Sequence, residues 1–120
     1  MPSRRTVLAG LIVGVVALGA VATVASAPTR ATNAESDYVA TRLADAACLD
    51  DWGVNEGAAS GSVAVTGLSP GGVRVSVTLP YAYRVETDEG PVFADTASEA
   101  VYVVSPFRTR RISGDEIAPC

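Results

Sequence analysis

Any chemistry in this chain has to rest on carboxylates, hydroxyls, tyrosines and arginines, because its 120 residues include no histidine and no lysine. Without histidine there is no Ser-His-Asp triad, no Cys-His pair and no His-ligated zinc site. Without lysine there is no Schiff base. No glycine-rich phosphate-binding loop precedes a predicted helix. We therefore expect no catalytic residue, no cofactor and no metal.

Two groups of carboxylates are nevertheless candidate sites. Asp50, Asp51, Asn55 and Glu56 fall within seven residues of predicted loop. That density of oxygen ligands suits Ca²⁺, but the spacing matches no calcium-loop pattern. Asp50 with Glu86 could form an acid–base pair, which would require a cleft that fixes their separation. In both cases the simpler interpretation is a solvated acidic surface.

Arginines form a local basic patch near the end of the sequence. Arg108, Arg110 and Arg111 are close in sequence, and Arg108 and Arg110 would share one face of a strand. The patch either neutralises neighbouring acids such as Asp115 and Glu116 or recognises an acidic ligand.

Two tyrosines lie at alternate positions of a predicted strand. Tyr81 and Tyr83 would therefore point to the same face. That face is either a binding platform or, the simpler interpretation, part of the core.

The chain has two cysteines, Cys48 and Cys120. Outside the cytoplasm two thiols tend to oxidise to one bridge, so we predict a disulfide between them. A bridge between two molecules is the alternative. There is no Cys-x-x-Cys pair, which argues against a redox-catalytic role.

The first 29 residues predict where the rest of the chain works. Arg4 and Arg5 precede an uncharged, mostly apolar run of 24 residues from Thr6 to Thr29. As a helix this run would be about 36 Å long, enough to cross a hydrocarbon core of about 30 Å. Arginines before a span stay on the cytoplasmic side, so residue 30 onward is expected outside. The sequence thus divides into an export signal or membrane anchor over 1–29 and a small extracytoplasmic domain over 30–120.

The segment Ser3-Arg4-Arg5-Thr6-Val7-Leu8 resembles the twin-arginine export motif. Val7 stands where that family usually has Phe, and Ala9 where Lys is frequent. The resemblance covers only the leader, residues 3–27, and implies export without implying an activity.

The fate of the leader has three interpretations. Ala25-Ser26-Ala27 has the small-x-small pattern of a cleavage site, so the domain could be secreted after cleavage near Ala27. Pro28 would follow the cut and fits poorly in an extended protease subsite, which favours a retained anchor over residues 6–29. The third interpretation is a pilin-like surface subunit, although Thr6 follows the arginines where a small residue would be expected.

The composition argues against a nucleic-acid binder. From Pro28 onward seven arginines face thirteen acids, a net charge of −6. Arg-only basicity with excess acid resembles the composition of halophilic proteins, in which acidic side chains keep the surface soluble. A GC-rich genome is the alternative explanation. An acidic domain is a poor ligand for nucleic acid or for anionic lipid headgroups.

A helix and several strands are predicted after the leader. We expect a linker over 28–31, then a helix over about 33–48 that begins with a Thr32–Glu35 capping box. Alternating apolar residues and turn signals then predict four to six antiparallel segments over 63–112. The fold class is α+β, with a membrane-spanning or signal helix and then one helix packed on the sheet. An immunoglobulin-like β-sandwich is the alternative.

These observations predict an exported or tethered non-enzymatic domain. Its expected partners are the membrane, through the N-terminal helix, and an unidentified protein or envelope component. The alternatives are the pilin-like subunit and a carboxylate-dependent enzyme.

Overall fold

The computed structural model describes residues 4–56 and 60–120, with side chains from Thr23 onward. Within them, a long helix precedes five strands: α1 (Arg4–Ala44), β1 (Leu49–Val54), β2 (Ser62–Ser69), β3 (Gly72–Thr87), β4 (Gly90–Ser105) and β5 (Arg108–Gly114). The strands form one antiparallel sheet in the order β1-β3-β4-β5, and β2 also pairs with β3. The predicted α+β fold, with one helix packed on an antiparallel sheet, is confirmed. The two-sheet alternative is wrong for the described residues.

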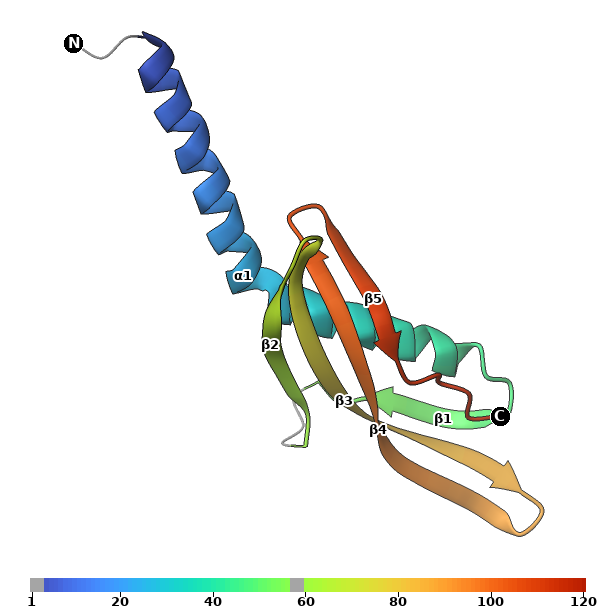
Figure 1. Ribbon diagram of the computed structural model, residues 1–120. Coiled ribbons are helices and arrows are strands. Elements are labelled where there is room, and N and C mark those ends of the chain that lie inside the picture. The colour runs from blue at the N-terminus through green and yellow to red at the C-terminus, as the bar shows by residue number, and fades with distance from the viewer. Residues whose placement is uncertain (1–3, 57–59) are drawn as a thin grey trace.

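The helix is continuous across the boundary at which a linker was predicted. Pro28 lies inside α1, and the Thr32 hydroxyl donates to the Pro28 carbonyl at 2.9 Å instead of capping a new helix. The predicted linker, the helix start at Asn33 and the capping box are therefore wrong. Proline removes one helical hydrogen bond and tends to kink a helix. Figure 1 shows α1 bending where it reaches the sheet, with its first half projecting as a stalk.

Most of the predicted leader lies where only the backbone is described. The export motif around Arg4 and Arg5 and the greater part of the apolar run fall in this region, so their side chains are outside the described residues. Among the residues described in full, no helix is long and apolar enough to cross a membrane.

The core lies between the second half of α1 and one face of the sheet. The antiparallel register places alternate residues of β3 and β4 on that face. The buried apolar side chains come from the helix (Ala27, Ala31, Val39, Leu43), from β3 (Val73, Val75, Val77, Leu79), from β4 (Ala100, Tyr102, Val104) and from the C-terminal tail (Ile117). The helix and the sheet therefore share a single core.

Pro80 lies inside β3 without breaking it. β2 pairs with β3 as far as Thr78, and β1 pairs with it from Tyr81 onward. Pro80 therefore sits where one neighbour ends and the next begins, so a missing N–H costs no ladder bond. Its carbonyl accepts from the Asn55 N–H at 2.9 Å.

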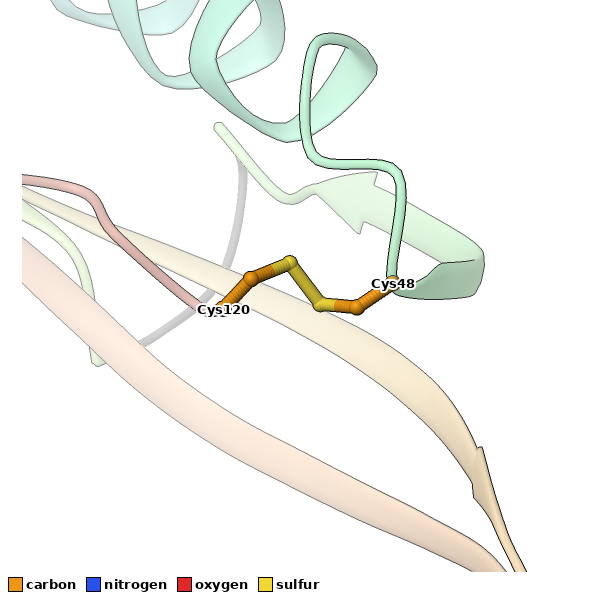
Figure 2. The surroundings of a disulfide bond; sticks show 2 residues. All are labelled: Cys48 and Cys120. Carbon is orange, nitrogen blue, oxygen red and sulfur yellow. A yellow bond between two sulfur atoms is a disulfide. The ribbon is translucent and has the colours of Figure 1, made fainter.

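A disulfide joins Cys48, just before β1, to Cys120 in the tail, with a Cα–Cα distance of 6.0 Å. Figure 2 shows the bridge crossing from the connection after α1 to the end of the described tail. The predicted bridge within one chain is confirmed.

Candidate functional site

The strongest side-chain cluster joins the helix to the last strand and is centred on Glu35. The Glu35 carboxylate is fully buried. Arg111 donates to it through Nε at 3.0 Å and Nη2 at 3.1 Å, and the Tyr102 hydroxyl donates at 2.9 Å. Three donors thus satisfy the carboxylate, which leaves it unsuited to act as a general base.

Arg111 is held from several other sides. Its guanidinium carbon lies 4.1 Å from the centre of the Tyr38 ring, and Nη2 also donates to the Asp115 carbonyl at 2.8 Å. A Cβ at Gly114, where φ is +153°, would come within 2.5 Å of Arg111 Nη2. Glycine at this position therefore leaves the space that the guanidinium occupies.

Burial and the Glu35 charge set the protonation states of this cluster. Burial raises the pKa of Tyr102, and its hydrogen bond to Glu35 adds to the rise. Burial lowers the pKa of Arg111, but the hydrogen bond and charge of Glu35 outweigh it and raise the pKa overall. Tyr102 is consequently neutral and Arg111 charged at physiological pH, as a structural ion pair requires.

A second cluster lies on the opposite face of the sheet and is organised by Arg84. Arg84 forms an ion pair with Asp50, and its Nε lies 3.8 Å from a Glu86 carboxylate oxygen. Asp50 and Glu86, the predicted acid–base pair, therefore both lie within ion-pair distance of the Arg84 guanidinium. The hydrogen bond that Arg84 donates to Asp50, followed by the charge of Asp50, raises the pKa of Arg84. Both carboxylates pair with a cation instead of facing each other across a cleft.

A shallow hollow of about 390 Å³ adjoins Arg84. Asp51 and Asp95 are among its lining residues, together with Phe93, which is 73 % exposed. Trp52 also lines the hollow, and Val92, the neighbour of Phe93 in the sequence, is exposed as well. The hollow therefore exposes apolar surface that is bordered by acidic groups.

The acidic segment proposed for Ca²⁺ does not form a cation site among the described residues, which omit 57–59. Asp50 is paired with Arg84, and the Asp51 carboxylate accepts from the Trp52 N–H. Asn55 is bound through its backbone to β3. No group of three or more acidic or sulfur ligands is positioned to hold a metal in this part of the chain.

The predicted basic patch is divided between the two faces of the sheet. Arg108 pairs with Ser105 and Arg110 with Val103, so they share the face away from α1. Arg111 points to the other face, toward Glu35. Arg74, which pairs with Val103 from the other side, takes the place of Arg111 in the patch.

Tyr81 and Tyr83 pack against the core, with ring centres 6.3 Å apart. Burial, followed by the neighbouring Tyr83, raises the pKa of Tyr81. The core interpretation of these tyrosines therefore agrees with their packing.

Glu35 and Tyr102 were not predicted as partners of Arg111. Glu35 lies 76 residues from Arg111, so no local spacing connects them. One signal was present: Glu35 lies four residues before Val39 and eight before Leu43, on the apolar stripe of the helix.

Comparison with models of protein families, with curated proteins and with solved structures found no match to this chain.

Proposed function

We propose that this protein is an extracytoplasmic docking domain that stays attached to the membrane by α1. The observation that carries the proposal is the position of the candidate cleavage site. Ala25, Ser26 and Ala27 lie inside α1, and Ala27 is fully buried in the core. A protease that binds its substrate as an extended segment would have to unwind this part of the helix and pull Ala27 out of the core.

The disulfide between Cys48 and Cys120 supports the compartment, because such bridges persist mainly in oxidising surroundings. The Arg84 hollow supports a binding role. Its exposed Phe93 is a side chain that a partner could cover. The carboxylate-dependent enzyme is the weaker candidate, since Glu35 has three donors and Asp50 and Glu86 share Arg84.

The pilin-like subunit is the second candidate, and the continuity of α1 favours it over a secreted domain. The helix provides one unbroken element whose first half projects and whose second half packs on the sheet (Figure 1). A pilin-like protein would be cleaved just after Arg5, whereas a tethered protein would not be.

N-terminal sequencing of the native protein, with separation of membrane and medium, distinguishes the tethered, the pilin-like and the secreted protein. We expect the membrane fraction to hold a chain that retains α1. An N-terminus just after Arg5 would establish the pilin-like alternative instead. An N-terminus near Pro28 on protein from the medium would overturn the proposal.

Ala25→Gln and Pro28→Ala serve as matched variants. A long polar residue at Ala25 blocks small-x-small cleavage, and alanine at Pro28 removes the obstacle after the cut. If the packed helix protects the site, neither variant changes the distribution between membrane and medium. If only the Pro28→Ala variant is released into the medium, the proline, and not the packing, prevents cleavage.

A further inference from the structure

The two most exposed large apolar side chains lie toward the same end of the sheet. Phe107 is 98 % exposed and Leu68 is 80 % exposed. Phe107 is in the turn between β4 and β5, and Leu68 is next to the last residue of β2. We call this the turn end, comprising residues 68–72 and 105–108. Exposed apolar residues gathered at one end indicate a contact surface.

The turn end is basic although the domain as a whole is acidic. Arg74, Arg108 and Arg110 lie on one face beside it, as the strand register requires. Among the described residues, none of the three has a carboxylate within ion-pair distance. At the opposite end, the turn between β3 and β4 carries Asp88 and Glu89.

Arg30 connects the turn end to the end of the uncharged run. Its Nη1 donates to the Ser105 carbonyl at 2.7 Å. Arg30 is also the first charged residue after the run from Thr6 to Thr29. Phe107 lies two residues beyond Ser105, at most about 7 Å, which equals four to five residues of helix rise. The β4–β5 turn therefore lies near the end of the run, and the stalk projects past this same end of the sheet (Figure 1).

We propose that the turn end rests on the surface of the membrane that holds α1. Phe107 enters the interfacial layer, while Arg74, Arg108 and Arg110 face anionic headgroups. This inference rests on the proposed function, because α1 must remain in the bilayer. A bilayer is favoured over a second copy of the chain because the anchor itself holds the turn at this height in every molecule.

Fluorescence quenching in vesicles tests the contact directly. The full chain is reconstituted in phosphatidylcholine–phosphatidylglycerol vesicles that contain lipids brominated in the acyl chains. Trp52→Phe removes the native tryptophan, and Phe107→Trp then reports on the turn. Phe93→Trp in the same background is the matched control, since Phe93 is also an exposed aromatic residue but adjoins the Arg84 hollow.

We expect quenching at least about threefold greater for Phe107→Trp than for Phe93→Trp, since interfacial aromatic rings lie near the acyl boundary. Adding Arg108→Gln and Arg110→Gln, or using phosphatidylcholine alone, should reduce the difference. Equal, weak quenching at both positions overturns the inference, as does a Phe107→Trp signal that depends on protein density instead of lipid, which would indicate a second copy. Flotation with the vesicles and resistance to carbonate extraction report separately on the anchor. Loss of the chain from the bilayer therefore rejects the proposed function, whereas a retained chain with an unquenched Phe107→Trp rejects only the membrane contact.

Discussion

The buried carboxylate of Glu35 fixes how the helix sits on the sheet. Removing a carboxylate and a guanidinium from water costs several kcal/mol per ion, and only complete hydrogen bonding offsets that cost. Arg111 and Tyr102 supply that bonding from β5 and β4. A shift of α1 by one residue would leave the carboxylate without these donors, so the pair selects one register.

Glu35→Gln should lower the free energy of unfolding by about 3 kcal/mol, because Arg111 would lose its counter-charge in a mostly buried site. Urea denaturation with the disulfide intact measures this loss. Glu116→Gln is the matched control: Glu116 is 81 % exposed and 3.8 Å from Arg42, so its loss should cost less than about 0.5 kcal/mol. Equal losses in the two variants would contradict a special role for the buried pair.

Tyr102 should make stability depend on pH in alkali. Its folded pKa is raised by burial and by Glu35, so its contribution is complete below the unfolded pKa of about 10 and declines as pH rises above it. Absorbance titration of the folded protein should show Tyr102 resisting ionisation until the chain unfolds, and Tyr102→Phe should remove that component. Ionisation of all four tyrosines together near pH 10 in the folded state would contradict this.

At the level of elements, the strands were more predictable than the helix. Period-two alternation identified β3 and β4, because side chains of a half-buried sheet must alternate. The helix start was predicted wrongly because proline costs about 3 kcal/mol inside a helix. Burial of Ala27 and Ala31 on either side of Pro28 offsets part of that cost, and this burial depends on the sheet. Strand β1 was not predicted, since its acid Asp50 is paired with Arg84, a contact that only the fold creates.

The disulfide secures two elements that end far apart in the chain. Cys48 and Cys120 are 72 residues apart, so opening the bridge should cost about 4 kcal/mol by the chain-entropy relation. Urea denaturation of the Cys48→Ser/Cys120→Ser variant measures this. The two single variants are controls, since each should lose about as much as the double variant. No loss in any of the three would show that α1 and the tail are held equally well without the bridge.

For the whole molecule, acidic charge opposes compactness. The net charge of −6 from Pro28 onward should make the melting temperature rise as NaCl is increased, because screening weakens the repulsion. Thermal denaturation at low and high salt tests this. Asp88→Asn/Glu89→Gln removes two charges from an exposed turn and should reduce the rise. A melting temperature that does not change with salt would contradict the halophile-like interpretation of the composition.

The long hairpin of β3 and β4 also determines the order in which the molecule can form during synthesis. Its fifteen residue pairs follow one another without a register shift and are joined by a short turn, so the hairpin can zip from that turn on a microsecond timescale. The helix leaves the ribosome first, yet its partner surface is completed only when β4 has been made. Val39 and Leu43 therefore remain exposed to solvent for the several seconds that translation of that distance takes. A stripe that lacks its partner surface is prone to aggregation until β4 has been made.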